Sequence, residues 1–338
     1  MGATKNKAIE FAEEMAQSED YAVFSQVLQK EEYSPMQTVI SGLKQRMLPM
    51  SYSKLKHLDS PVNFINNLLK PVERNTAMTF GSVVDCLLLE PHKFDKKFAI
   101  VSETPTTENQ KTFVNYFLNE TSPLEAYDDR FEQALKASYK NDGRRYVKGL
   151  HDYLNAMESG KDVTSQQIYE KAKEVSDNLA NAPEVADELA VCDAFQKFIE
   201  FSYQGWTFRG ILDTYSPEVL HDLKFSNDCN PENFGRSIDK FGYDVQFGLY
   251  LIGLEILGLA DNPKFKYILF DDKFNYSVLE VGEDYLNYGK RKVENYVKRL
   301  NKMVDEDAFR RSYDYFKSKN VIHKPRWIAG LDEEIFND

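Results

Sequence analysis

The chain has 338 residues, of which 42% are hydrophobic, 13% aromatic and 28% charged. This composition excludes a disordered or collagen-like protein, and a chain of this length can bury a sizeable core. No apolar run approaches the roughly 20 residues of a membrane span, and the acidic residues 1–20 lack the apolar core of a secretory signal. The three cysteines are widely spaced and form no C-x-x-C pair. We therefore expect a cytoplasmic protein without structural zinc or an iron–sulfur cluster.

The net charge of -12 is unevenly distributed along the chain. Residues 290–326 carry twelve Lys and Arg against five Asp and Glu, a local balance of +7, which leaves -19 for the rest. A basic segment on an acidic body is compatible with a polyanion bound at one place. It is equally compatible with an ordinary solvated helix.

The first half of the chain is predicted to be helical. A helical arm is expected over residues 1–40, and residues 51–69 are helical in pattern, with Ser51 and Ser53 as candidate N-caps. A short buried helix is expected over 79–91, ending at a proline. The polar stretch 105–190 has a helical period throughout and is predicted to be an insertion.

The β content is concentrated in the second half. Three consecutive strands are predicted at 195–204, 206–215 and 219–225, with turns at Gln204-Gly205 and Ser216-Pro217. One helix over about 232–258, two strands at 265–272 and 276–282, and a basic helix over 283–304 complete the order. This order indicates an α/β (α+β) fold in which helices flank a mixed central sheet.

Two of the predicted strands carry carboxylates near their ends, in the stretch RGILDTYSPEVLHDLKFS. The period of two places Asp222 and Lys224 on one face of their strand. Asp213 ends the preceding strand, and the two strands are expected to pair. Two carboxylates about 4 Å apart repel each other by about 4 kcal/mol at an effective dielectric constant near 20. A shared proton, a nearby cation or a bound metal ion would offset that cost, and oxygen ligands from two Asp favour a hard ion such as Mg²⁺ or Mn²⁺. With Lys224 beside it, this is the layout that metal-assisted attack on a phosphodiester needs.

The helix that follows presents Tyr243, Gln246 and Tyr250 at positions i, i+3 and i+7 on one face. These groups are placed to touch a metal-bound water or a phosphate. The alternative is structural: D-x-K on a strand is often a surface salt bridge, and Tyr243 can be a boundary residue of an amphipathic helix.

Three sequence blocks carry a family resemblance: SYSKLKHLDSPVNFI, FGSVVDCLLLEPHKFDKKFAI, and NPENFGRSIDKFGYDVQFGLYLIGL, which follows G-x-x-D and D-L-K. They resemble the PD-(D/E)XK nuclease superfamily, and more closely its RecE-type (exodeoxyribonuclease VIII-like) phage exonucleases. The similarity covers about 51–101 and 195–330.

The resemblance implies a PD-(D/E)XK restriction-endonuclease-like core and a role for each matching residue. Metal ligands would be Asp213, Asp222 and the Leu223 carbonyl, and Lys224 would orient the water. Gln246 and Tyr250 would support the site and the scissile phosphate. Asp85 stands where the family has a histidine and is a further candidate ligand; Phe225 replaces the usual Thr or Ser.

The family further implies digestion of linear duplex DNA from its ends, usually 5′ to 3′, with Mg²⁺ or Mn²⁺, leaving single strand for a recombinase or annealing protein. It also implies ring-shaped homo-oligomers threaded by DNA. The nuclease domain would span 41–330, with its catalytic sheet and helix at 195–282 and an acidic tail at 331–338. The candidate DNA-binding residues are Ser51, Ser53, Lys54, Lys290, Arg291 and Lys292.

Two alternatives remain open: a nuclease for single strands or flaps, and a DNA-end-binding or scaffold protein whose nuclease site has weakened, for which Asp85 is the warning sign. Other chemistries lack their motifs. The five histidines form no H-x-x-x-H pair, and there is no G-x-x-x-x-G-K-[ST] loop.

Overall fold

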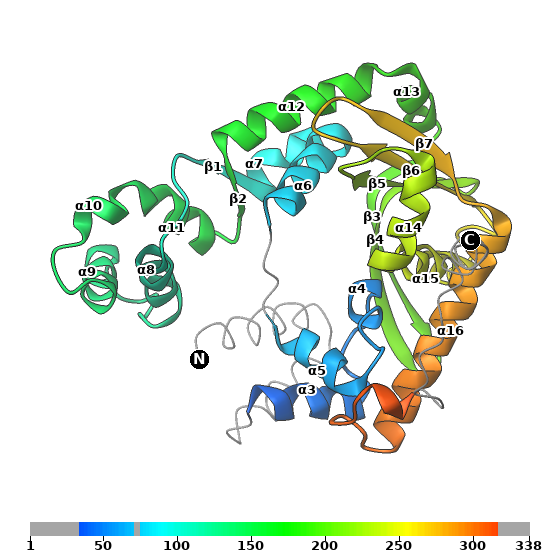
Figure 1. The fold of residues 1–338 in the computed structure, drawn as a ribbon, viewed down its shortest axis with the longest axis horizontal. Coiled ribbons are helices and arrows are strands. Elements are labelled where there is room, and N and C mark those ends of the chain that lie inside the picture. Colours follow the sequence, from blue (N-terminus) through cyan, green and yellow to red (C-terminus); the bar gives the residue numbers. More distant parts are fainter. Residues whose placement is uncertain (1–33, 71–74, 317–338) are drawn as a thin grey trace, which may run out of the picture.

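The computed structural model describes residues 34–70 and 75–316 (Figure 1). Residues 1–33 of the arm predicted over 1–40, and the acidic tail predicted at 331–338, lie outside the described residues. In this part of the chain, no helix combines the length and the apolar character that crossing a membrane would require.

Three short helices open the described chain: α3 (Pro35–Lys44), α4 (Tyr52–Leu55) and α5 (Pro61–Leu69). The stretch predicted as helical over 51–69 is divided because Ser60 caps a new helix that starts at Pro61, a proline being tolerated only in the first turn. Ser51 is the N-cap residue of α4, but its hydroxyl bonds Ser53 Oγ at 2.8 Å instead of capping the backbone.

In the second half of the chain, the strands form a hairpin and a separate three-stranded sheet. The hairpin pairs β3 (Ala194–Tyr203) with β4 (Trp206–Tyr215) antiparallel. In the second sheet, β5 (Val219–Phe225) pairs parallel with β6 (Lys264–Phe270), which pairs antiparallel with β7 (Tyr276–Glu280). The expected mixed α/β architecture is confirmed.

The expectation that β4 and β5 pair as neighbouring strands is wrong, because they belong to different sheets. Two side chains of β4 accept the β5 amides that a backbone ladder would use: Asp213 Oδ2 accepts from Leu223 N at 2.9 Å, and Thr214 Oγ1 accepts from His221 N at 2.8 Å. The two strands therefore remain in contact but diverge from the Ser216-Pro217 turn, and a space for side chains opens between them.

The helix predicted over 232–258 is two helices, α14 (Pro231–Phe241) and α15 (Tyr243–Ile256). Gly242 separates them with a φ of 72°, the left-handed conformation that ends many helices. Apart from Tyr243, α15 is buried up to Leu254, so it is a core helix and not the amphipathic helix that was considered. It packs closely on α16 (Glu283–Asp305), where Gly248 meets the backbone of Gly289.

The other face of the second sheet is covered by α6 (Thr76–Leu89) and α12 (Gln166–Asn181), with α13 (Pro183–Ala190) following at the edge (Figure 1). Leu223, Ile268 and Phe270 of the sheet join the core between these layers. The helices α12 and α13 fall within the stretch 105–190 that was predicted as an insertion, yet they pack with this sheet.

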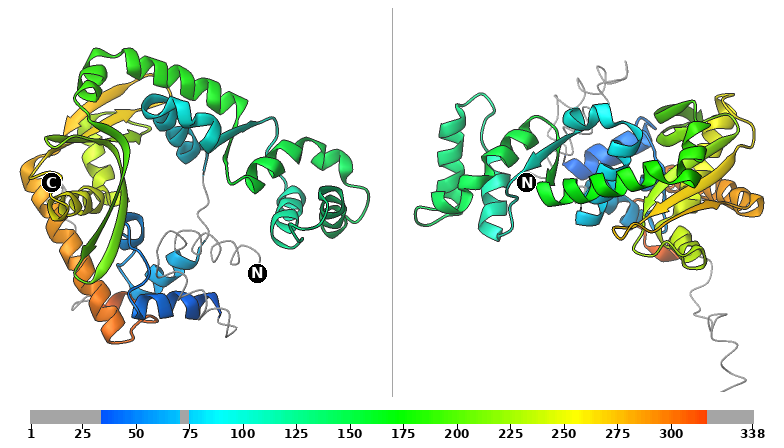
Figure 2. Two further views of the ribbon diagram at one scale, coloured as in Figure 1. Left: turned by 180° about the vertical axis from the view of Figure 1, so that it is seen from behind. Right: turned by 90° about the horizontal axis from the view of Figure 1, so that it is seen from above.

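Within the described residues, four α-helices stand apart from that core: α8 (Glu108–Asn119), α9 (Tyr127–Ser138), α10 (Arg144–Val147) and α11 (His151–Glu158). They share a separate hydrophobic cluster and form a lobe to one side in both views of Figure 2. After α7 (Phe94–Lys97), the chain enters the lobe through β1 (Phe98–Val101) and leaves it through β2 (Asp162–Ser165), which pair in parallel. These two short strands were not predicted.

Candidate active site

The two carboxylates predicted to converge, Asp213 of β4 and Asp222 of β5, lie where these strands diverge. Asp213 Oδ2 accepts the Leu223 N–H, and its Oδ1 accepts from Gln196 Nε2 at 3.1 Å. Its orientation is therefore fixed from β5 and from β3 at the same time. This anchoring replaces part of a strand ladder, which explains why a poor strand former is placed at this position.

Asp222 and Lys224 form an ion pair that is buried, so the surface salt bridge considered for D-x-K is wrong. Their side chains are 3% and 15% exposed. Lys224 Nζ contacts Asp222 Oδ2, while Asp222 Oδ1 accepts from Gln246 Nε2 at 2.7 Å. A buried charge pair contributes little to stability after its desolvation is counted, so its presence here calls for another reason.

Tyrosines surround the Lys224 ammonium. The Tyr243 ring centroid lies 4.9 Å from Nζ, so this tyrosine is more than a boundary residue. Tyr52 comes close because Met50 forms a bridge to Phe208 of β4, which sets the start of α4 beside the site. Burial alone would lower the pKa of Lys224, but Asp222, Tyr52 and Asp213 together raise it well above its ordinary value. The side chain therefore remains a cation.

Gln246 and Tyr250 meet as the i, i+4 spacing predicts. The Gln246 Nε2 that donates to Asp222 also lies 3.3 Å from the Tyr250 hydroxyl, which in turn donates to the Ile211 carbonyl at 2.9 Å. Gly210 makes this approach possible, because a Cβ there would lie 2.7 Å from the Tyr250 ring. The glycine of the RGILD stretch is thus required by the tyrosine of the following helix.

Burial raises the pKa of all three acidic residues near the site. For Asp222, burial and the charge of Asp213 outweigh the opposing effect of Lys224 and raise the pKa to about 7. The pKa of Asp213 is also raised, chiefly by burial, although Lys224 and the Leu223 amide oppose the shift. Such carboxylates hold their charge poorly without a further cation, and with the Leu223 carbonyl they offer the oxygen ligands that Mg²⁺ and Mn²⁺ prefer.

Asp85 projects from α6 toward the same carboxylates. Burial and the charge of Asp213 raise its pKa well above the ordinary value, and its Oδ1 is buried without a hydrogen-bond partner in the described chain. Nevertheless, within 34–70 and 75–316 no three His, Cys, Asp or Glu side chains are gathered closely enough to form a ready metal cluster. Asp85 therefore faces the site electrostatically, and its role as a ligand stays a prediction.

The structure does not bring the candidate DNA-binding residues together. Lys54 Nζ bonds the Pro49 carbonyl at 2.9 Å, at the start of the α4 turn that also holds Ser51 and Ser53. On α16, Lys290 pairs with Glu255 at 3.4 Å, and Lys292 pairs with the buried Asp244 at 2.6 Å; Arg291 between them is exposed. Successive helix residues point about 100° apart, so these three share no face. Their part in DNA binding stays a prediction.

Sequence reasoning missed Gln196. It adopts a left-handed φ of 49° inside β3, and the ladder that pairs Phe195 with Thr214 and Lys197 with Leu212 omits the Gln196–Asp213 pair between them. Left-handed backbone at a non-glycine strand residue costs on the order of 1 kcal/mol and is concentrated at functional sites. The distortion turns the Gln196 amide toward the Asp213 carboxylate; no feature of the AFQKF stretch signals it.

One family model matches most of the chain. The family model described as a PDDEXK-like domain of unknown function (DUF3799) matches residues 51–312. No curated protein matches the chain. Among solved structures, a "Putative exonuclease" from Eubacterium rectale is 16% identical, with a TM-score of 0.45, over 90% of this chain and 98% of that one. At that distance the structural likeness bears on neither substrate nor reaction.

Proposed function

Because the chain belongs to the family of PDDEXK-like domains of unknown function (DUF3799), we propose that it is a divalent-metal-dependent nuclease that hydrolyses the phosphodiester bonds of DNA. The observation that carries this proposal is the buried Asp222–Lys224 pair, held by Gln246 and set beside Asp213. A lysine and two acids buried at one point cost stability and are retained where they do chemistry.

The residues present fit a hard metal ion. Asp213, Asp222 and the Leu223 carbonyl would hold it, and Asp85, with a buried unpartnered oxygen, is the candidate for a further ligand. When bound, such an ion polarises the phosphate and lowers the pKa of a water.

The protein's own groups account for the remaining requirements. Gln196 and Gln246 fix one oxygen each of Asp213 and Asp222, which preorganises both carboxylates. Lys224 stays protonated, so it acts as a donor and a positive charge beside the attacking water and the phosphate, and not as a base. Tyr250 holds Gln246 in place through its own bond to the Ile211 carbonyl.

The substrate we propose is linear duplex DNA, degraded from its ends in the 5′ to 3′ direction with Mg²⁺ or Mn²⁺. This rests on the RecE-type motifs, as does the placement of the enzyme in phage recombination in a bacterial cytoplasm. A single-strand annealing protein and a ring of identical subunits are the partners we propose. The three cysteines are free, as a reducing compartment would leave them.

Digestion of end-labelled linear duplex and of the same sequence as a covalently closed circle, over a titration of Mg²⁺, tests the proposal. We expect the linear DNA to be degraded and the circle spared, and a 5′ label to be released before a 3′ label. Rapid cutting of the circle would contradict an exonuclease, and preference for single-stranded or flap DNA would favour the related branch. No hydrolysis at any metal concentration would favour a weakened, end-binding protein.

A further inference from the structure

A groove opens beside the catalytic residues between α4, the α14–α15 junction and α16, with a volume of about 740 Å³. Its walls carry four Lys and Arg side chains but only two Asp, a local balance of +2 on a chain whose net charge is -12. Neither Asp213 nor Asp222 lines it, so it is a site separate from the carboxylate pair.

The cations in the groove differ in how far they are already neutralised. Lys292 pairs with the buried Asp244, and Arg299 Nη1 lies 3.9 Å from Asp59 Oδ1. Lys56 and Lys240 have no carboxylate partner in the described part of the chain. Lys56 is half-buried, and its pKa is lowered by that burial and by Lys224. A half-buried cation without a counter-charge favours an anionic ligand.

Aromatic rings alternate with these cations. Tyr288 is 45% exposed and Phe241 is 44% exposed, and both line the groove. Arg299 lies over the Tyr296 ring at 5.5 Å. Basic side chains that follow a backbone, interleaved with exposed rings on which bases can stack, are the combination that binds single-stranded nucleic acid.

The groove continues from the catalytic residues. Tyr243, which lies under Lys224, is 5.6 Å from Phe241 between ring centroids, and Phe241 forms part of the groove wall. Lys56 lies against Gly242, the neighbour of Phe241, and follows directly from the α4 turn that carries Tyr52. A strand held at Lys224 thus has a path lined by rings and cations that leads away from the reacting centre.

We propose that this groove binds a single strand of DNA next to the cleavage site, with its phosphates on Lys56, Lys240 and Arg299 and a base on Tyr288. This inference rests on the proposed nuclease function and deepens it, because a groove for one strand requires the two strands of a duplex to separate at the enzyme. A duplex carries its bases stacked inside and would leave the exposed rings unused.

The test is binding of a labelled single strand of about 15 nucleotides, near the upper end of such site sizes. EDTA prevents hydrolysis, so the wild-type chain can be used. Each lost phosphate contact reduces the salt slope of single-strand binding by about 0.7. We expect the double variant Lys240→Ala/Arg299→Ala to flatten that slope by about 1.4 and to weaken binding at least about tenfold.

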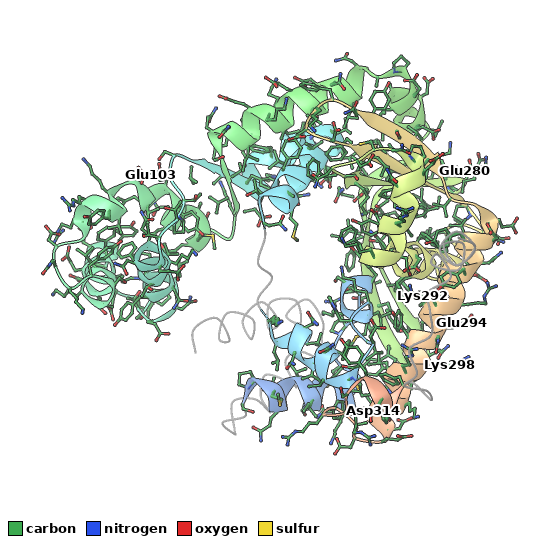
Figure 3. The ribbon with its side chains drawn as sticks, viewed as in Figure 1. Glu103, Glu280, Lys292, Glu294, Lys298 and Asp314 are labelled. Carbon is green, nitrogen blue, oxygen red and sulfur yellow. The ribbon has the colours of Figure 1, made fainter. Side chains whose placement is uncertain are left out.

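Two control variants distinguish the loss of a groove contact from a general change in charge or a folding defect. Lys298→Ala removes an exposed cation from the same helix outside the groove, as Figure 3 indicates along α16, and should leave the slope unchanged. Tyr288→Phe should retain affinity, whereas Tyr288→Ala should lose about fivefold or more, because stacking on a ring needs no hydroxyl.

The proposal is overturned if the groove variants bind as wild type does, or if Lys298→Ala weakens binding as much as they do. Binding is measured without metal, so it is independent of hydrolysis. If the groove variants weaken binding as expected but the wild-type protein does not cut DNA, only the nuclease function is disproved. If the wild-type protein cuts DNA but the groove variants bind single strands normally, only the proposed role of the groove is disproved.

Discussion

At the scale of single residues, Asp222 and Lys224 make the sharpest prediction. Asp222→Asn and Lys224→Met each keep the shape of the side chain and remove the charge, and each should slow DNA hydrolysis more than about 100-fold, or ~2.7 kcal/mol of barrier. Circular dichroism should show that both variants fold. Lys264→Ala, an exposed lysine on the neighbouring strand β6, serves as the control. Activity within tenfold of wild type for either charge variant would refute the assigned roles.

Two substitutions at Gln196 separate the effect of its hydrogen bond to Asp213 from the effect of its strained backbone. Gln196→Ala should raise the metal concentration needed for half-maximal activity several-fold, because Asp213 loses the donor on its Oδ1, and saturating metal should restore part of the rate. Gln196→Gly removes the same donor but relieves the left-handed φ of 49°, so it should be the more stable variant by about 1 kcal/mol.

Equal metal titrations for wild type and both Gln196 variants would show that the amide does not position Asp213. Urea unfolding of the two variants at one pH measures the strain independently of catalysis.

The raised pKa of Asp85 predicts that the stability of the protein depends on pH. Its pKa in the folded protein is raised well above 3.8, so its contribution to stability is fully present below about 3.8 and is lost as pH rises through the folded pKa. Without metal, Asp85→Asn should therefore become more stable than wild type as pH increases, with a slope difference of at most about 1.4 kcal/mol per pH unit.

Thermal unfolding between acidic and mildly basic pH, in EDTA and then in Mg²⁺, measures both effects. If Asp85 is a ligand, Mg²⁺ should stabilise wild type more than Asp85→Asn. The same Mg²⁺ stabilisation in both proteins would restrict the side-chain ligands to Asp213 and Asp222.

At the scale of elements, the break between α14 and α15 controls the groove wall. Gly242→Ala adds a Cβ at a φ of 72° that would lie 3.1 Å from Lys56 Cβ. We expect a loss of stability of about 1–2 kcal/mol from the left-handed backbone, with a further contribution from that contact. Gly258→Ala is the matched control, since its φ of 64° imposes similar strain with nothing within 4 Å. Equal losses in urea unfolding would show that the contact with Lys56 is unimportant.

The elements also show where sequence reasoning succeeds and where it fails. The D-L-K spacing placed Asp222 and Lys224 on one strand face, and the helical spacing placed Gln246 and Tyr250 on one helix face, because these periods fix which side chains share a face. The sequence analysis missed that the helix ends at Gly242 and a new one begins, because the apolar pattern continues through this position. A glycine after Phe241 is nevertheless a typical helix end. The left-handed backbone of Gln196 depends on its partner Asp213 across the hairpin, and local residue preferences carry no information about it.

At the scale of the whole molecule, α15 shows how tertiary structure changes the meaning of a pattern. Its tyrosines and Gln246 suggested one polar face, but the hairpin, α4 and α16 pack around it and bury nearly every position. The polar groups of α15 are therefore paired inside the protein, with Gln246 on Asp222 and Asp244 on Lys292. One helix thus joins the Asp222–Lys224 pair to the groove wall.

The parallel pairing of β1 with β2 constrains how the lobe of α8–α11 can be exchanged. In an antiparallel pair the chain would leave and return at the same end, and the lobe could be cut out and the ends joined by a tight turn. Here Phe98 pairs with Asp162 and Val101 with Ser165, so the lobe begins and ends at opposite ends of the two-stranded ribbon. A shortened chain must run back along the ribbon for about 10 Å before it can resume at Asp162. Another segment can thus replace the lobe only if it is long enough to cover this distance. A short turn in its place would pull β1 and β2 out of register.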